Sequence, residues 1–347
     1  MDLSAKIIGI KYKPYLCADL KEFAFRELEE VLSKHASFIL NFSKGKSVAI
    51  SWWVSAKRTR SYPYARVYDT LNFAGRKITI IPIVKDEGKK GDRDFLQWDT
   101  ISLMSLLGVY VIIGYYVEAE RSKRYRHKIT NQRFDVGYIK EKIQEILSYQ
   151  SDALHWNLSQ IDKIGEIAQK ALKSYKLISK KTKVEMHSWV SAEKRIKQLQ
   201  RGKEKFMNLS RALAKKAQRR ESITTQPKEY LSGEKGIITI KNYLGGFYYF
   251  TVDEVELKGK EVYLIEGKHS KGTLPSVGDI KDGLIKMILF TNLEDVRING
   301  RSFNPRPVLK LTVENHFDVR KLTSTQKRNL KLLNEEAKTN NFILKIL

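Results

Sequence analysis

Residues 247–270, FYYFTVDEVELKGKEVYLIEGKHS, decide the fold of the C-terminal part of the chain. Two runs rich in β-branched and aromatic residues flank the tripeptide Lys258-Gly259-Lys260. Such runs are typical of strands, and glycine readily adopts the positive φ that a tight turn requires. The stretch therefore predicts a β-hairpin.

Three polar side chains of this hairpin form a candidate catalytic site. Asp253 lies in the first strand, and Glu266 and Lys268 lie in the second, separated by Gly267. Side chains alternate along a strand, so Glu266 and Lys268 share a face, and the hairpin brings Asp253 beside them. Carboxylates suit Mg²⁺, which can activate water and stabilise charge in phosphodiester hydrolysis. We expect Asp253 and Glu266 to hold Mg²⁺ and Lys268 to orient or stabilise the attacking hydroxide.

The same acid-x-Lys spacing occurs at residues 256–258, 279–281 and 336–338. The last two lie in helical pattern, where positions i and i+2 do not share a face, and the first runs into the turn. Two alternatives remain open: an exposed hairpin with a surface Glu–Lys pair, and a rival acidic site elsewhere. That rival site would use Asp92, Asp94, Asp99, Glu118 and Glu120.

The segments around the hairpin predict a compact α/β unit. A strand is expected at 236–240 and a helix at about 276–290, followed by strands in DVRING and PVLKLTVEN and a polar helix at 324–338.

Residues 236–296 resemble the core of the PD-(D/E)XK nucleases, the fold of many type II restriction endonucleases. The resemblance implies a central mixed sheet flanked by helices, in the order strand, acid-bearing strand, E-x-K strand, helix, strand. Val252 stands where the motif has proline, so Glu254 is kept as the reserve for Asp253. The family often adds an acid from a preceding helix, for which Glu204 and Glu229 are candidates.

Charge points to a polyanionic partner. The chain has 64 Lys and Arg against 39 Asp and Glu, a net charge of +25. Residues 179–220 alone hold fourteen Lys or Arg and three Glu. Nucleic acid is the commonest partner for such an excess, although charge runs are usually solvated faces. We expect Lys215 and Lys216 to contact DNA phosphates.

Residues 51–68, SWWVSAKRTRSYPYARVY, mix aromatic and basic side chains. This mixture suits stacking and base-edge contacts, and it equally suits a core strand with a basic tip. The DNA-binding candidates here are Trp52, Trp53, Lys57, Arg58, Arg60, Tyr62, Tyr64 and Arg66.

The whole chain predicts a mixed α/β protein. Residues 1–150 form the expected N-terminal α/β recognition domain, 151–222 a basic helical segment, and 223–347 the nuclease core. A helix is expected at 19–33, strands in SFILNF, SVAISWWV and KITIIPIV, and a helix at 137–149. The uncharged stretch 101–117 is interpreted as a buried helix and strand divided by Gly108, not as a membrane span.

The first hypothesis is a Mg²⁺-dependent, sequence-specific endonuclease of the type II restriction class, acting on double-stranded DNA as a homodimer. A cognate DNA methyltransferase would be its genetic partner. A single cysteine and an N-terminus without the pattern of a signal peptide favour a reducing interior, cytoplasm or nucleoid. The resemblance implies that this interior is the cytoplasm of a prokaryote. The alternatives are a repair, mobile-element or defence nuclease without strict specificity, and a non-catalytic nucleic-acid-binding protein.

Overall fold

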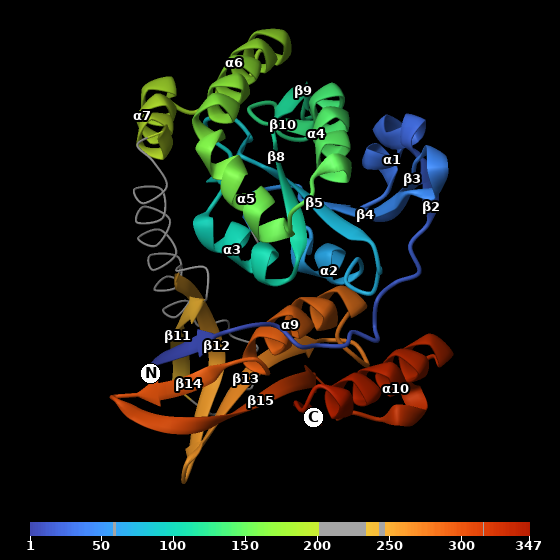
Figure 1. The fold of residues 1–347 in the computed structure, drawn as a ribbon, viewed down its shortest axis with the longest axis vertical. Coiled ribbons are helices and arrows are strands. Elements are labelled where there is room, and N and C mark those ends of the chain that lie inside the picture. Colours follow the sequence, from blue (N-terminus) through green and yellow to red (C-terminus); the bar gives the residue numbers. More distant parts are fainter. Residues whose placement is uncertain (58–59, 201–233, 243–246, 315) are drawn as a thin grey trace. The chain divides into compact units, whose positions relative to one another are not determined.

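The chain forms two mixed α/β units (Figure 1). Unit 1 comprises residues 1–19 and 211–347, and unit 2 comprises residues 20–210. This division differs from the expected boundaries at 150 and 222. The first strand pairs with the C-terminal part, and the helices that follow residue 150 pack against strands of residues 109–121. The computed structural model describes all residues except 58–59, 201–233, 243–246 and 315.

Unit 1 is built on a mixed sheet whose strands follow the order β13-β12-β11-β1-β14-β15-β16. An additional parallel pairing of β13 with β15 closes six of these strands into a ring. The expected chain order of strand, acid-bearing strand, E-x-K strand, helix and strand is present as β11, β12, β13, α9 and β14. The resemblance implied a central sheet flanked by helices, whereas this sheet closes on itself. The strands are β1 (Asp2–Ile7), β11 (Glu234–Asn242), β12 (Phe247–Lys258), β13 (Glu261–Ser270), β14 (Glu294–Ile298), β15 (Arg301–Val313) and β16 (Ile343–Ile346).

Two long strands and two tight turns explain the closure. β12 pairs with β11 over most of its length and with β13 at its end, while β15 changes partner from β14 to β13. The predicted turn is confirmed, since Gly259 has φ +62°. Asn299 and Gly300, with φ +49° and +78°, join β14 to β15 as the Asn-Gly pair favoured in two-residue hairpins.

Two helices complete unit 1. α9 (Val277–Phe290) begins at the cap Ser276, whose hydroxyl accepts a hydrogen bond from the Asp279 amide, and it packs against β13 and β15. α10 (Ser324–Thr339) packs against β16 and begins with a capping box formed by Thr323 and Gln326. Both helices were predicted within two residues.

Unit 2 has a five-stranded sheet in the order β2-β3-β4-β5-β8. β3 and β4 are antiparallel, and the other pairings are parallel. Two ribbons, β6–β7 and β9–β10, stand apart from it. The strands are β2 (Glu22–Ala24), β3 (Ser37–Asn41), β4 (Ser47–Trp52), β5 (Arg76–Pro82), β6 (Val84–Asp86), β7 (Arg93–Phe95), β8 (Val109–Gly114), β9 (Tyr116–Arg121) and β10 (Ile129–Phe134).

The helices of unit 2 include the expected basic helical segment as far as residue 200; the rest of that segment lies outside the described residues. α5 packs against β8, and α6 packs against β9 and α7. The helices are α1 (Leu28–Lys34), α2 (Pro63–Tyr68), α3 (Trp98–Leu106), α4 (Val136–Ser148), α5 (Ala153–Asp162), α6 (Ile164–Thr182) and α7 (Trp189–Gln200).

Most of the local predictions for unit 2 are confirmed. The three strand runs form β3, β4 and β5, and the uncharged stretch forms α3 and β8 with Gly108 between them at φ +66°. The single helix expected at 19–33 is wrong, because residues 22–24 pair with β3 and the α-helix begins only at Leu28. Among the described residues, no helix has the length and apolar character needed to cross a membrane.

Candidate active site

The hairpin places Asp253, Glu266 and Lys268 together. Glu254 pairs with Ile265, so continuing the antiparallel register by one residue sets Asp253 opposite Glu266. Asp253 Oδ2 accepts a hydrogen bond from the Gly267 amide at 2.9 Å. Lys268 Nζ lies 2.9 Å from Glu266 Oε1. The structure therefore brings together all three residues that the sequence predicted.

Helix α9 adds two charged residues that the sequence analysis missed. Lys268 Nζ also contacts Asp282 Oδ2 at 3.1 Å. Lys286 Nζ contacts Glu266 Oε2 and lies 3.8 Å from Asp253 Oδ1. Asp282 and Lys286 are four residues apart on one helical face. A charged residue between the apolar neighbours Ile285 and Met287 was the available signal, since a lysine is seldom buried without a partner.

Gly283 lets the helix approach this site closely. A Cβ atom at this position would lie 2.8 Å from Leu309 Cδ1, 3.3 Å from Lys268 Cε and 3.6 Å from Glu266 Cγ. A side chain here would press on the stem of Lys268 and on Glu266, so the small residue fixes how near Asp282 and Lys286 come.

Burial and charge set the protonation of the two carboxyl groups in opposite directions. Burial, followed by the neighbouring Glu266 carboxylate, raises the pKa of Asp253 to about 7. Burial alone would also raise the pKa of Glu266, but the ammonium groups of Lys268 and Lys286 hold it well below its usual range. Lys268 keeps its proton, because Glu266, Asp282 and Asp253 raise its pKa against the effect of burial.

The two carboxylates of this site are suited to a metal ion that needs few protein ligands. Among the residues that the structure describes, no three His, Cys, Asp or Glu side chains gather closely enough to hold a metal ion. Mg²⁺, however, is often bound through one or two carboxylates, with water and substrate phosphate as the other ligands. The facing carboxylates of Asp253 and Glu266 could hold such an ion. The side chains of Asp253 and Asp282 are 24% and 27% exposed, against 1% for Glu266, so solvent reaches Asp253 and Asp282 while Glu266 is enclosed.

Glu254, the reserve for Asp253 as a metal ligand, does not belong to this site. Glu254 is fully buried on the opposite face of the sheet, where it pairs with Lys310 at 3.1 Å. Glu204 and Glu229 lie outside the described residues. The other acid-x-Lys sequences at 279–281 and 336–338 lie in α9 and α10, as expected.

The aromatic residues of segment 51–68 are largely engaged inside unit 2. Trp53 and Tyr64 are buried and pack edge to face. Trp52 donates its ring N–H to the His35 carbonyl, and Arg66 stacks on Trp52 and donates to its carbonyl. These contacts of Trp52, Trp53, Tyr64 and Arg66 fit the alternative expectation, in which the segment packs within the protein.

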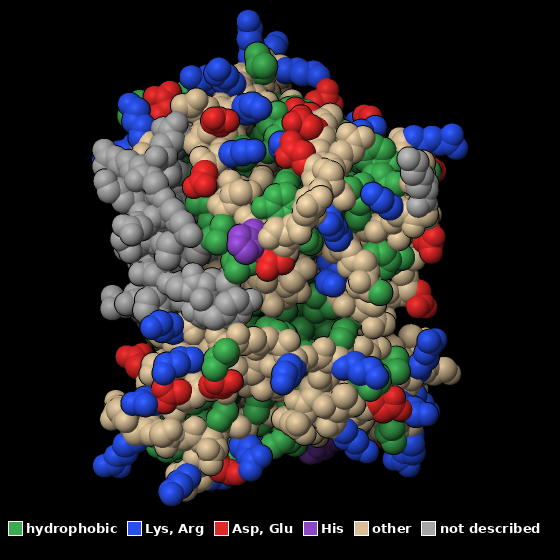
Figure 2. Space-filling view, in the orientation of Figure 1, with side chains coloured by type: hydrophobic (Ala, Val, Ile, Leu, Met, Phe, Trp, Pro, Cys, Tyr) green, Lys and Arg blue, Asp and Glu red, His purple; other side chains and the backbone are tan. Residues whose placement is uncertain are grey.

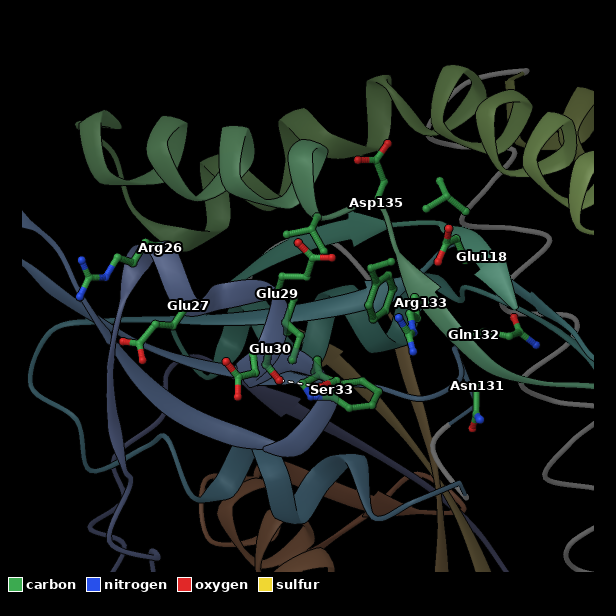
Figure 3. Close-up of a pocket in the computed structure, with 15 residues that line it drawn as sticks. Arg26, Glu27, Glu29, Glu30, Ser33, Glu118, Asn131, Gln132, Arg133 and Asp135 are labelled. Carbon is green, nitrogen blue, oxygen red and sulfur yellow. Dashed lines mark hydrogen bonds between the residues drawn. The ribbon is translucent and has the colours of Figure 1, made fainter. Parts of the chain in front are cut away.

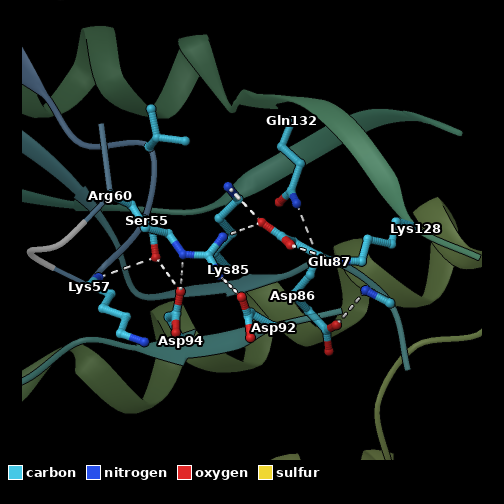
Figure 4. Close-up of polar contacts among 12 residues, drawn as sticks. Ser55, Lys57, Arg60, Lys85, Asp86, Glu87, Asp92, Asp94, Lys128 and Gln132 are labelled. Atoms are coloured by element: carbon cyan, nitrogen blue, oxygen red, sulfur yellow. Dashed lines mark hydrogen bonds and ion pairs between the residues drawn. The ribbon is translucent and has the colours of Figure 1, made fainter. Parts of the chain in front are cut away.

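The remaining candidates fall into three groups. Arg60 is surrounded by Glu87, Asp92 and Asp94, and Asp94 also accepts a hydrogen bond from Ser55 (Figure 4). Asp92 and Asp94, two acids of the rival site, thus form ion pairs with the guanidinium group of Arg60. Two other candidates, Lys57 and Tyr62, are exposed. Three candidates lie outside the described residues: Arg58, Lys215 and Lys216.

A cleft of about 1190 Å³ in unit 2 lies beside Trp52 and Phe134 (Figure 3). The charged residues of its lining are mainly acidic, and an acidic surface repels phosphate. The cleft therefore gives no support to DNA reading through the exposed part of Trp52. The charged residues that line it are Arg26, Glu27, Glu29, Glu30, Glu118, Arg133 and Asp135.

Comparison of the chain with protein-family models, with curated proteins and with solved structures gave no match.

Proposed function

We propose that the chain is a Mg²⁺-dependent DNA endonuclease with a PD-(D/E)XK-type site in unit 1. The observation that carries this proposal is the convergence of Asp253, Glu266 and Lys268 on one face of the β12–β13 hairpin. A solvated Glu–Lys surface pair would not require two carboxylates, two lysines and a helix glycine to be packed together. This arrangement therefore supports a chemical role for the cluster.

In this proposal Asp253 and Glu266 hold Mg²⁺, which supplies positive charge at the scissile phosphate and lowers the pKa of a bound water. Lys268 is permanently charged and is held by Glu266 and Asp282, so its ammonium group is fixed beside the carboxylates. From there it can stabilise an attacking hydroxide. Such preorganised charge costs no rearrangement during the reaction.

The charge of the chain supports DNA as the substrate. On the face drawn in Figure 2, Lys and Arg side chains lie on both units, interspersed with Asp and Glu. A denser basic region is residues 163–183 of unit 2, with seven Lys and one Glu. Contacts to phosphates would position the duplex, and contacts to base edges would give sequence specificity.

We expect plasmid DNA to be cut in Mg²⁺ and to stay intact in EDTA. Discrete fragments from genomic DNA would identify sequence-specific cleavage of the restriction type, and a smear would identify the nonspecific alternative. Intact DNA with every divalent ion would contradict the proposal and favour a non-catalytic binder.

Cleavage should depend on pH through Asp253. A protonated carboxyl group is a poor Mg²⁺ ligand, so below a pKa of about 7 the single-turnover rate should fall about tenfold per pH unit.

The stability of the metal-free protein should depend on pH in the opposite sense, being higher at low pH. A folded-state pKa above the unfolded value stabilises the fold at low pH, and this contribution is lost as pH rises to about 7. Asp253→Asn should remove this pH dependence of stability; an unchanged profile in that variant would exclude Asp253 as the titrating group.

The wider expectations rest on the resemblance alone. A homodimer would place one site on each DNA strand, a methyltransferase would protect the host DNA, and the prokaryotic cytoplasm would be the compartment. Light scattering of the protein on a cognate duplex would count the protomers.

A further inference from the structure

The two lysines of the site are held in different ways. Lys268 lies between Glu266 and Asp282, so it retains one carboxylate partner if Glu266 is engaged elsewhere. Lys286 lies between Glu266 and Asp253, and its other hydrogen bond goes to the carbonyl of Thr251 at 3.2 Å. Both carboxylate partners of Lys286 are therefore the groups to which the proposed function assigns the metal.

Lys286 and a metal ion would compete for the same carboxylate oxygens, Glu266 Oε2 and Asp253 Oδ1. The lysine side chain is 10% exposed and its ammonium group lies in the gap between Asp253 and Glu266. Mg²⁺ binds carboxylate oxygens at about 2.1 Å, which would put a second positive charge against that ammonium in a poorly solvated place. The flexible four-carbon stem of lysine allows the ammonium to move away.

We infer that Lys286 is an internal counter-ion that fills the site when metal is absent and competes with the divalent ion for Asp253 and Glu266. The lysine places one positive charge between two carboxyl groups that would otherwise repel each other, and thereby helps to keep the empty site folded. The same charge weakens the affinity of the site for a divalent metal ion. This inference rests on the proposed function, because it takes these carboxylates as the metal ligands.

The test is the affinity for Ca²⁺, measured by calorimetry without DNA, so that no cleavage is involved. Lys286→Met should bind Ca²⁺ about tenfold to a hundredfold more tightly than the wild type, the usual range for coupling between two bound groups. Lys286→Arg keeps the charge and should stay near the wild-type affinity. Lys271→Met removes an exposed lysine close in sequence to the site and controls for net charge.

Asp253→Asn should abolish Ca²⁺ binding, which establishes that the measured ion occupies this site. Circular dichroism checks that Lys286→Met is folded, and Lys268 remains there to balance Glu266. Equal or weaker binding by Lys286→Met would overturn the inference while leaving the proposed function standing. Absence of Ca²⁺ and Mg²⁺ binding in the wild type and in Lys286→Met would overturn both.

Discussion

Glu266→Gln is expected to lower the rate of DNA cleavage by about a thousandfold or more, because the amide cannot replace a buried anionic ligand of Mg²⁺. Lys268→Ala should cause a comparable loss by removing the fixed charge beside the carboxylates. Both variants should still bind DNA in Ca²⁺, which tolerates looser coordination than Mg²⁺. Single-turnover cleavage and a gel-shift assay in Ca²⁺ measure the two effects separately.

The chain contains a matched control for this experiment. Glu256 and Lys258 have the same spacing as Glu266 and Lys268 and also pair with each other, at 3.4 Å. They lie at the end of β12, next to the turn. Glu256→Gln and Lys258→Ala should therefore cleave at the wild-type rate. Full activity in Glu266→Gln, or equal losses in both pairs, would exclude the assigned site.

The site could be predicted from sequence because its three residues lie on one hairpin. The turn at Gly259 fixes the register, and alternation along the strands fixes the face, so local pattern alone places Asp253, Glu266 and Lys268 together. Lys286 was not found, because its role depends on how α9 rotates over the sheet. That rotation is determined by tertiary contacts, including the close approach at Gly283.

Long-range pairing explains what else could not be predicted. β1 pairs with β11 at a separation of more than 230 residues, and nothing local specifies that partner. Alternation was visible in β1, whose Leu3, Ala5 and Ile7 are buried, but alternation does not identify a neighbouring strand. Arg60 presents the same difficulty. In the sequence, a basic residue among aromatic ones is compatible with a contact to DNA and with an ion pair inside the protein. The structure shows ion pairs, because Arg60 contacts three acidic residues that lie 27 to 34 positions later in the chain.

Among the features invisible in the sequence, Glu336 carries the largest expected effect on stability. This residue of α10 is fully buried. Its carboxylate accepts hydrogen bonds from the Tyr12 hydroxyl at 2.7 Å and from the amides of Tyr15 and Leu16 at 3.0 and 3.2 Å. The pKa of Tyr12 is raised, by burial first and by Glu336 second, so this hydroxyl keeps its proton and remains a donor. One side chain thus ties the segment after β1 to the last helix.

Glu336→Ala should lower the free energy of unfolding by about 3 kcal/mol, since it leaves three donors without this acceptor in a place that water barely reaches. Glu335→Ala removes the exposed neighbouring carboxylate and should change stability by less than about 0.5 kcal/mol. Urea denaturation gives the two values. Hydrogen exchange then locates the effect, because the amides of Tyr15 and Leu16 should lose protection in Glu336→Ala alone. Retained protection at both amides would mean that the segment is held by its apolar contacts and not by this carboxylate.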